Sequence, residues 1–518
     1  MKNLTNFAFS IVAGLLLTAA FPRTGAWPLA GIALAPLLVA IRNAGPAEAF
    51  RMGWVAGMAH ALTLVYWIAH TLGAYGGLPV WVSVPVLGLL AAYLALYPAA
   101  FAAVLRGVWT APALSAPTVP MVWTALEYVR AHLLTGFPWA LLGYAPFRQL
   151  HLVQISDIVG VYGVSFLLVS INSAFALGWM AIRKLSWGDR AVDRRTAGAA
   201  GVLAIALTLG TLAYGHFRLD QIEARAEEAP VTRAAVVQGN IEQAVKWDPA
   251  HQERTVEKYV ALSLAAMADR PDLVVWPETA APFYFLHNRP MTARVLEGVR
   301  EAGAFFIVGS PSFERGPESM ALFNSAFLIR PDGRLSGRYD KHHLVPFGEY
   351  VPLGDFFPFL DTLVAQVGNF RSGTKGEVLH ADGHRPGVLI CYEGIFPALA
   401  RAAVLNRAGL LVNITNDAWY GRSSAPYQHF SMAVLRAVET RRGLVRAANT
   451  GISGFIHPTG RIDGTTGLFE DAVATRALPV MDKITIYTRI GDLFAQLCVA
   501  GTLILGIIRL CQWRRKTK

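Results

Sequence analysis

The stretch Gly387 to Gly394, GVLICYEG, decides how the second half of this chain folds. It begins as a short run that is apolar at every position, and the run ends at a thiol, Cys391, followed two residues later by a carboxylate, Glu393. Such a run is typical of a strand that is covered on both faces. We therefore predict a buried strand that carries Cys391 to its carboxyl end.

Similar runs recur on both sides of this strand. Helical stretches separate them, for example 254–266 and 431–442. Buried strands alternating with helices indicate an α/β domain with covered sheets, and no internal repeat or low-complexity linker interrupts it. The other runs are AAVVQGN (234–240), DLVVWPET (272–279), FFIVGSPS (305–312), SAFLIRPDG (325–333), LLVNITND (410–417) and SGFIHPTG (453–460).

The composition of the whole chain is too apolar for a soluble protein. Of its 518 residues 54% are hydrophobic and only 16% are charged. A formal net charge of +11 is compatible with nucleic-acid binding. In a chain this apolar, however, Lys and Arg collected in short cytoplasmic loops explain the charge better. We expect a lipid bilayer as partner and no nucleic acid.

Eight apolar runs approach the length needed to cross a bilayer, although the first two are short. One of them, 119–134, contains Glu127 and Arg130, and ionisable residues at membrane depth usually face protein or a water-filled cavity. We predict about seven helices in residues 1–216 and a last one in 490–518. The runs are 7–20, 27–41, 52–70, 80–104, 119–134, 161–182, 197–214 and 490–508.

Basic residues orient this predicted bundle. They fall on one side of the membrane if the N-terminus is cytoplasmic, and an even number of spans then returns the C-terminus, WRRKTK, to that side. The start, MKN followed by an apolar run, resembles a signal peptide, but the next run follows so closely that we expect a retained first helix. Residues 217–489 then form an extracytoplasmic domain. The orienting residues are Arg42, Arg51, Arg106, Arg183, Lys184, Arg190, Arg194 and Arg195.

Three reactive side chains stand at or just beyond apolar strands: Glu278, Lys341 and Cys391. A thiol needs a base to become the attacking thiolate, and a carboxylate can supply it. An ammonium group can stabilise the oxyanion of a tetrahedral intermediate. The other two cysteines, Cys498 and Cys511, lie in or beside the last apolar run, so no disulfide framework is implied.

Longer motifs surround these three residues and give the chain a family resemblance. WPET (276–279), the segment around Lys341 and ICYE (390–393) resemble the three catalytic motifs of the nitrilase superfamily, in that order, over residues 231–478. The membrane runs, together with KHHLVPFGEYVP (341–352), ICYEGIFP (390–397), TNDAWYG (415–421) and the pair Gln428–His429, resemble the apolipoprotein N-acyltransferase family, the membrane-bound branch of that superfamily.

This resemblance implies a multi-pass α-helical membrane domain that carries an α/β nitrilase-like αββα sandwich. It implies that Glu278 is the general base, Lys341 the oxyanion stabiliser and Cys391 the nucleophile. Two further acids match family positions: Glu349, which we expect to orient the lysine, and Glu393, which we expect to support the site. Many soluble nitrilases have aspartate where this chain has Glu393.

Aromatic residues near these motifs are candidates for substrate binding. Trp247 matches a family tryptophan near the substrate entrance. Tyr392, beside the nucleophile, is a supporting candidate. Trp276, Trp419 and Tyr420 are candidates for lining a lipid-binding cleft, and core packing explains these aromatics equally well. His342 and His343 are adjacent in an extended segment, so at most one can face the site, and we expect neither to be catalytic.

The implied reaction transfers an acyl chain from a glycerophospholipid, through a cysteine thioester, to the N-terminal amine of diacylglyceryl-cysteine in an apolipoprotein. No cofactor and no metal are expected, and the chain is expected to act as a monomer in the bacterial cytoplasmic membrane, with its catalytic domain facing the periplasm. Two alternatives remain: a membrane-anchored amidase that uses water as acceptor, and a non-catalytic transporter or scaffold with an external binding domain.

Overall fold

The computed structural model describes residues 2–108, 115–315, 320–351, 369–380 and 382–516. The chain forms two compact units. The first comprises residues 1–73, 77–219 and 490–518, and the second comprises residues 74–76 and 220–489. The second unit is therefore inserted between two helical parts of the first.

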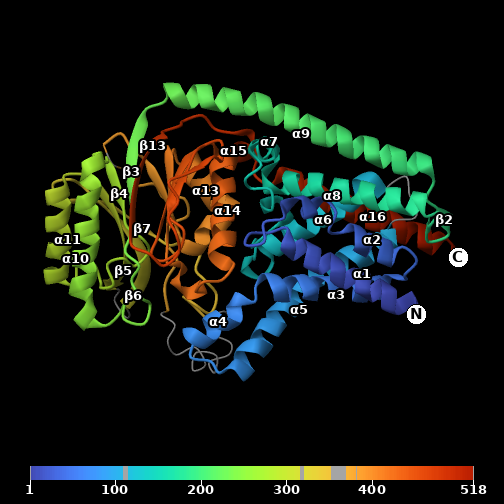
Figure 1. The fold of residues 1–518 in the computed structure, drawn as a ribbon, viewed down its shortest axis with the longest axis horizontal. Helices are drawn as coiled ribbons and strands as arrows, with labels where there is room; N and C mark the ends of the chain where they lie inside the picture. The colour runs from blue at the N-terminus through green and yellow to red at the C-terminus, as the bar shows by residue number, and fades with distance from the viewer. Residues whose placement is uncertain (1, 109–114, 316–319, 352–368, 381, 517–518) are drawn as a thin grey trace. The chain divides into compact units, whose positions relative to one another are not determined.

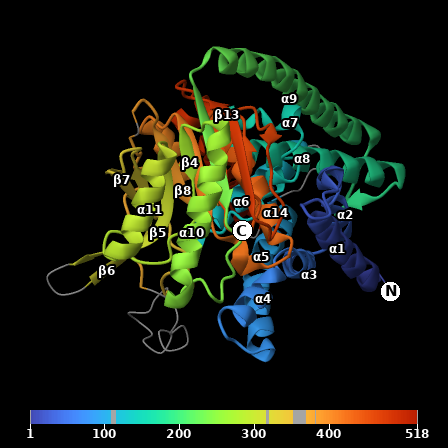
Figure 2. The ribbon, with the colours of Figure 1, turned by 60° about the vertical axis from the view of Figure 1, so that its left-hand side comes forward.

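The first unit is helical (Figure 1). Each of its long helices corresponds to an apolar run of the sequence, because a continuous apolar helix satisfies all its backbone groups internally. α8 and α9 are joined by a two-stranded hairpin, β1 (Ser186–Trp187) and β2 (Arg190–Ala191), and diverge with distance from it (Figures 1 and 2). The helices are α1 (Lys2–Ala19), α2 (Ala35–Ile41), α3 (Pro46–Leu64), α4 (Trp67–Ala74), α5 (Val80–Val108), α6 (Ser115–His132), α7 (Leu150–Val153), α8 (Ser156–Ile182), α9 (Arg194–Glu228) and α16 (Leu493–Lys516).

Within the described part of the chain, four helices are long and apolar enough to cross a membrane: α5, α8, α9 and the 493–512 part of α16. The pair α3 and α4 is bent by 51° and makes a fifth candidate if it forms one span. The apolar runs at 7–20 and 27–41 form shorter apolar helices, and the run at 119–134 lies mostly in α6. The predicted count of eight spans remains a prediction.

In its described residues, the second unit contains two mixed sheets. One has six strands in the order β13-β3-β4-β5-β6-β7, and the other has five in the order β12-β11-β10-β9-β8. β3, β4 and β5 are parallel to one another, as are β8, β9 and β10. The strands are β3 (Val231–Gln238), β4 (Leu273–Val275), β5 (Phe305–Arg315), β6 (Met320–Ile329), β7 (Leu335–Asp340), β8 (Pro386–Ile390), β9 (Leu410–Thr415), β10 (Gly443–Ala448), β11 (Gly454–Ile456), β12 (Ile462–Asp463) and β13 (Ala472–Pro479).

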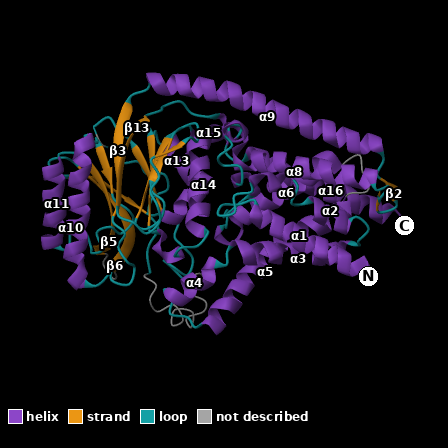
Figure 3. Cartoon of the chain, viewed as in Figure 1, coloured by secondary structure: helices purple, strands orange, loops and turns teal. Residues whose placement is uncertain are grey.

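Two apolar layers hold these sheets in place. Residues of both sheets, among them Val236, Ile307, Ile390 and Val412, form a buried core between them. The opposite face of the six-stranded sheet packs on α10 (Pro249–Ala266) and α11 (Arg289–Ala302), and α13 (Pro397–Leu405) and α14 (Ala425–Thr440) belong to the side of the five-stranded sheet (Figure 3). This arrangement confirms the predicted αββα sandwich.

Local signals fix where the outer helices begin and end. The Asp248 carboxylate accepts a hydrogen bond from the backbone N–H of Ala250 and caps α10, and Asn288 caps α11 in the same way. α11 ends at Gly303, which has a φ of 66°, the left-handed conformation that glycine adopts at little cost. Three 3₁₀ turns, η5 (Met267–Asp269), η6 (Cys391–Ile395) and η7 (Asp417–Tyr420), connect helices and strands of this unit.

Candidate active site

The three predicted catalytic residues follow the carboxyl ends of three strands in the second unit. Glu278 lies three residues beyond β4, and Lys341 and Cys391 directly follow β7 and β8. β4 and β7 run in the same direction, because β4 and β5 are parallel and two antiparallel pairings follow. Their ends therefore meet at one edge of the six-stranded sheet, and β8 of the facing sheet delivers the cysteine.

Both carboxylate oxygens of Glu278 are held by neighbouring groups. Oε1 accepts a 2.8 Å hydrogen bond from the Asn324 side-chain amide, and Oε2 accepts one of 2.9 Å from the backbone N–H of Asn416. Gly309 of β5 lies directly beneath this turn, where an added Cβ would come within 2.3 Å of the Pro277 carbonyl oxygen. Only glycine lets the strand approach the base this closely.

Lys341 is fully buried between two carboxylates. Its ammonium donates to Glu349 Oε1 at 2.9 Å and lies 3.7 Å from Glu278 Oε1. Asn324 ties the same two acids together by donating to both. Burial alone would lower the pKa of Lys341, but the negative charges of Glu349 and Glu278 raise it above its usual range. The lysine therefore carries a permanent positive charge.

Cys391 is the first residue of η6 and occupies the strained turn at the end of β8. Its φ is 53°, the left-handed region that residues with a side chain rarely adopt. Strain of this kind persists where the surroundings fix it, and here one ring nitrogen of His429, Nε2, lies 3.2 Å from the Cys391 carbonyl oxygen. The turn ends the strand abruptly and leaves the thiol at its tip, 7% exposed.

The charges around the thiol explain why it needs a base. Burial and the nearby Glu278 carboxylate raise the pKa of Cys391, and the Lys341 ammonium opposes them. The resting residue is therefore a protonated thiol. Because Glu278 and Lys341 both act electrostatically on this sulfur, the three residues form one site that contains a proton acceptor, a cation and a nucleophile.

Glu393 connects the nucleophile turn to the lysine segment. Its carboxylate accepts hydrogen bonds from the backbone N–H groups of Ile390, His342 and His343 and from the Tyr339 hydroxyl, at 2.7–3.0 Å. The side chain is completely buried, and four donors can satisfy it there. Glu393 thus holds β8 and the residues after β7 in one geometry without contacting the thiol through a hydrogen bond among those described.

The histidine pair points to structural partners. His342 Nδ1 lies 2.8 Å from the Gly373 carbonyl oxygen. The His343 ring packs 3.9 Å from the Phe396 ring, and burial together with His342 and Lys341 lowers the pKa of His343 to about 4. His343 is therefore uncharged near neutral pH.

The aromatic candidates divide into two groups. Trp276 is fully buried among Tyr259 and Phe306 in the core beneath α10, and its indole N–H donates to Ser263 Oγ at 2.8 Å, so its position favours the packing explanation. The others lie on the site or its surface. Tyr392 is buried beside the nucleophile. Burial raises the pKa of Tyr420, which also lies close enough to Cys391 and Glu278 for their negative charges to raise it further. Trp247 and Trp419 are exposed.

A buried charged layer behind Cys391 escaped sequence reasoning. The Asp417 carboxylate lies 2.9 Å from Arg446 Nη2 and 3.0 Å from His429 Nδ1, and all three side chains are inaccessible. Burial opposes ionisation of Asp417, but Arg446 and His429 outweigh it and lower the pKa of the acid to about 2. The pair Gln428–His429 belongs to a recognisable motif, but nothing in the sequence indicates that Arg446 of β10 lies beside it.

A second buried lysine also escaped sequence reasoning. Lys246 is 1% exposed, and its ammonium donates to the Glu278 carbonyl oxygen at 3.2 Å. Burial lowers the pKa of Lys246 to about 8, although Glu278 and Cys391 act in the opposite direction. In the sequence, a lysine before WDP is typical of a solvated loop. Only the neighbouring Trp247 indicates that this segment lies near the site.

No described group of three or more His, Cys, Asp or Glu residues is arranged to hold a metal ion. The polar groups of the site instead bind one another, through Asn324, Asn416 and the two lysines. The arrangement can therefore perform acid–base and nucleophilic chemistry with its own side chains.

Comparison with known proteins identifies two matching regions. Residues 13–174 match the model of the apolipoprotein N-acyltransferase N-terminal domain, and residues 233–483 match that of the carbon-nitrogen hydrolases. An apolipoprotein N-acyltransferase of Geobacter metallireducens is 46% identical over 99% of this chain and 96% of its own length. Those of Bradyrhizobium diazoefficiens and Methylococcus capsulatus are 36% and 33% identical, over 82% and 98% of this chain and 79% and 96% of their own lengths. A solved amidase from Nesterenkonia sp. is 21% identical, with a TM-score of 0.38 over 51% of this chain and 95% of its own.

Proposed function

The chain belongs to the apolipoprotein N-acyltransferase family, and from that premise we propose that Cys391 carries the acyl group between a phospholipid donor and a lipoprotein acceptor. The protein is an acyltransferase of a bacterial membrane. The observation that supports this role for Cys391 is its position at the strained tip of β8, where Glu278 and Lys341 both act on the buried thiol.

In the first half-reaction the Glu278 carboxylate takes the thiol proton, and the Cys391 sulfur attacks the ester carbonyl carbon of a glycerophospholipid. A C–S bond forms, and the Lys341 ammonium stabilises the charge that develops on the carbonyl oxygen. Collapse breaks the ester C–O bond. Protonated Glu278 returns its proton to the departing alkoxide, so a lysophospholipid leaves and a thioester remains.

In the second half-reaction the N-terminal amine of a diacylglyceryl-cysteine attacks the thioester carbon. Glu278 accepts a proton from the amine as the C–N bond forms, the C–S bond breaks, and the proton passes to the leaving sulfur. The products are an N-acylated lipoprotein and the free thiol. Because Cys391 is almost inaccessible and its neighbours bind one another, the thioester is shielded from water between the two steps.

The location that suits both substrates is the outer face of the bacterial cytoplasmic membrane. An acyl chain in a bilayer loses about 0.8 kcal/mol for each methylene exposed to water, so a donor is best taken directly from the membrane. The basic residues of the helical unit favour a cytoplasmic position for its short loops. We therefore assign the second unit, residues 220–489, to the periplasm, with the chain acting as a monomer.

The decisive experiment follows acyl transfer in two stages. Full-length protein in detergent is mixed with a phospholipid that carries a fluorescent acyl chain, and a hydroxylamine-sensitive label on Cys391 is measured by peptide mass spectrometry. A synthetic diacylglyceryl-cysteine peptide is then added. We expect the label to pass to the peptide amine. Hydrolysis without transfer would instead indicate an amidase, and failure to label would indicate a binding protein.

Matched cysteine variants locate the label. Cys391→Ala removes only the nucleophile and should abolish labelling. The double variant Cys498→Ala/Cys511→Ala keeps the nucleophile and changes the two other cysteines, one in the apolar helix α16 and one exposed near its end. It should label as the unmodified protein does. Labelling of the Cys391→Ala variant at a normal rate would contradict the assignment.

A further inference from the structure

An apolar groove runs between α8 and α9 in the helical unit, outside the catalytic unit. Its volume is about 640 Å³. Its lining combines small residues with large apolar side chains that are more than half exposed, such as Phe175, Trp179 and Ile205. The lining residues are Ile171, Ala174, Phe175, Gly178, Trp179, Ile182, Gly201, Ala204, Ile205, Thr208 and Leu209.

The described residues leave this groove open. Only 11% of the apolar window of α9 is buried, compared with 67% for α8, so α9 contacts the rest of its unit sparsely. A membrane helix cannot leave an empty apolar space beside it, and water is excluded from the hydrocarbon region. In a bilayer, the acyl chains of lipids fill such a space.

The size and position of the groove match one leaflet. On α8 the lining runs from Ile171 to Ile182, which spans roughly 16 Å at 1.5 Å per residue. This is about half of the ~30 Å hydrocarbon thickness of a bilayer. The groove is thus about as long as a single layer of lipid chains is deep, and on α8 it ends at Ile182, directly before the hairpin.

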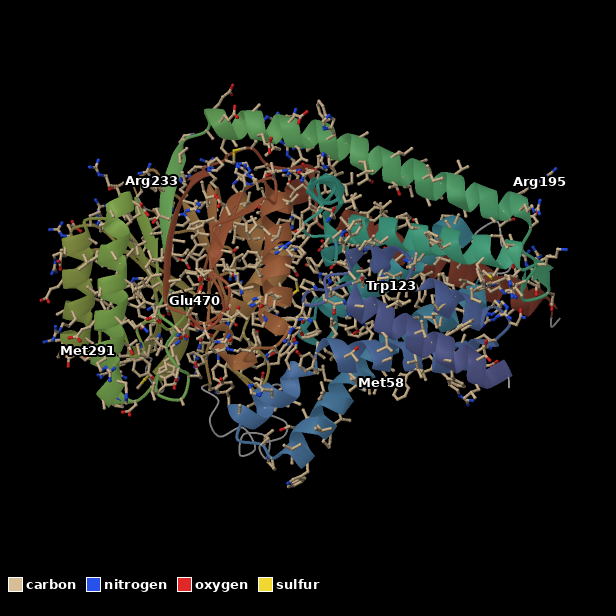
Figure 4. The ribbon with its side chains drawn as sticks, viewed as in Figure 1. Met58, Trp123, Arg195, Arg233, Met291 and Glu470 are labelled. Atoms are coloured by element: carbon tan, nitrogen blue, oxygen red, sulfur yellow. The ribbon has the colours of Figure 1, made fainter. Side chains whose placement is uncertain are left out.

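The hairpin end of the groove is basic. Residues 183–195 contain five basic residues, all exposed, and two acidic ones, Asp189 and Asp193, which leaves a net charge of +3. Arg183 connects this charge to the groove, because its guanidinium lies 5.4 Å from the ring of Trp179 on the rim. Arg195, labelled in Figure 4, projects from the same end of α9. The basic residues are Arg183, Lys184, Arg190, Arg194 and Arg195.

We propose that this groove is a binding site for an anionic phospholipid of the bilayer, whose chains lie between α8 and α9 and whose phosphate meets the basic residues of the hairpin. Basic pockets between membrane helices are suited to anionic head groups. This lipid is separate from the acyl donor. α9 ends at Glu228, three residues before β3 begins at Val231. The bound lipid therefore stabilises the helix that leads into the catalytic unit.

Native mass spectrometry of the full-length protein with added phosphatidylglycerol or phosphatidylcholine tests the proposal. We expect unmodified protein to retain one phosphatidylglycerol and to prefer it about tenfold. Gly178→Leu/Gly201→Leu should fill the groove and lose this lipid. A Cβ added at either glycine meets no atom within 4 Å, so the variant should fold, and thioester formation at Cys391 checks that it does.

Two controls isolate the groove and its charge. Gly210→Leu is the matched control for the filled groove, because Gly210 lies on α9, has the same open surroundings and does not line the groove. Arg183→Gln/Lys184→Gln should bind both lipids equally, whereas Arg51→Gln should keep the preference. Retention of phosphatidylglycerol by the filled variant would overturn the site, and an unchanged preference in the Arg183→Gln/Lys184→Gln variant would overturn the anionic assignment.

Discussion

Individual site residues could be predicted where they lie within sequence motifs. Residues that reach the site from a distant part of the chain could not. Glu278 and Cys391 stand at strand ends within long motifs, so their positions follow from the sequence. Lys246 and Asn324 come from segments far away in the chain, and only folding brings them to Glu278. Neither hydrophobic periodicity nor residue spacing in the sequence predicts these contacts.

Lys341 permits a direct test of oxyanion stabilisation. Lys341→Ala should slow formation of the Cys391 thioester by roughly 100- to 1000-fold, because loss of one such donor costs about 2.7–4 kcal/mol. Lys341→Arg should restore little, since the pocket is closed around a compact ammonium held by Glu349. The measurement is single-turnover acylation by a fluorescent phospholipid without acceptor. A normal acylation rate in Lys341→Ala would assign the lysine to the second step instead.

Lys246 should affect stability and activity in opposite directions. Its pKa is about 8 in the folded protein, against 10.5 for an ordinary lysine, so between these values the unfolded chain binds more protons and stability rises with pH. Below pH 8 the buried charge opposes folding by about 3 kcal/mol. We expect Lys246→Met to raise the thermal midpoint at pH 7, and to lose this advantage above about pH 10.

The same substitution should slow acylation about three- to tenfold, because it removes a positive charge that acts on Cys391 and Glu278. Lys246→Arg should recover part of the rate. Lys258→Met is the surface control, since Lys258 is partly exposed and pairs with Asp471, and both its stability and its rate should stay nearly unchanged. A destabilised Lys246→Met protein with normal acylation would show that the lysine serves packing alone.

At the scale of elements, apolar runs predicted seven strands and two helical segments that the structure contains, and they missed β7, β10, β12 and β13. β10 is fully buried, but Arg446 interrupts its apolar run, and the sequence does not reveal that Asp417 compensates this charge. β13 is partly exposed and mixes polar with apolar residues, as an edge strand can. Strands that are apolar at every position are thus easier to recognise than strands that carry a charge compensated by a distant partner.

The charged layer that joins β10 to the turn after β9 should be essential to the five-stranded sheet. Arg446→Met leaves the Asp417 carboxylate buried without its main partner and should cost about 3–5 kcal/mol. Asp417→Asn/Arg446→Met should recover part of this loss. Thermal unfolding in detergent measures both, with the exposed pair Arg476–Asp463 as control, where Arg476→Met should cost less than about 1 kcal/mol. A loss below 1 kcal/mol for Arg446→Met would contradict this account.

Asp417 also predicts how this layer responds to acid. Its pKa is about 2 in the folded protein and near 3.8 in an unfolded chain. The stabilisation from its ionised form is therefore complete above pH 4 and is lost as the pH falls toward 2. Asp417→Asn should flatten this part of the stability profile, measured as the thermal midpoint between pH 5 and 2. An unchanged acid slope would place the titration in other carboxyl groups.

At the scale of the whole molecule, composition and charge predict a membrane part and an inserted α/β part. The two units divide at Leu219–Asp220 and at Arg489–Ile490, and residues 74–76 also belong to the second unit. The expected domain boundaries, 216–217 and 489–490, remain predictions. The number of membrane spans is harder to predict from the sequence. Short or bent apolar helices, such as the pair α3 and α4, satisfy the composition of a span without its length.

The orientation of the units is a prediction for the intact protein in its membrane. A single cysteine placed in the 184–195 loop, in a variant whose exposed Cys511 is changed to alanine, should resist a membrane-impermeant thiol reagent applied to spheroplasts. A cysteine at the exposed Met320 should react. The asymmetry follows from the concentration of basic residues in the loop. Reaction at the loop and protection at residue 320 would reverse the topology and require a different substrate.

The pairing of β3 with β13 has a consequence for biosynthesis. β13 covers one edge of β3 by pairing Val231 with Pro479 and Gln238 with Ala472. The first strand of the domain therefore completes its pairing only after the last strand has been synthesised. Ribosomes add about 5–20 residues per second, and roughly 240 residues separate the two strands, so this edge stays unpaired for about 12–50 s during synthesis. An unpaired strand invites intermolecular pairing. The newly made chain therefore passes through a period of vulnerability to aggregation that ends only when residue 479 has emerged.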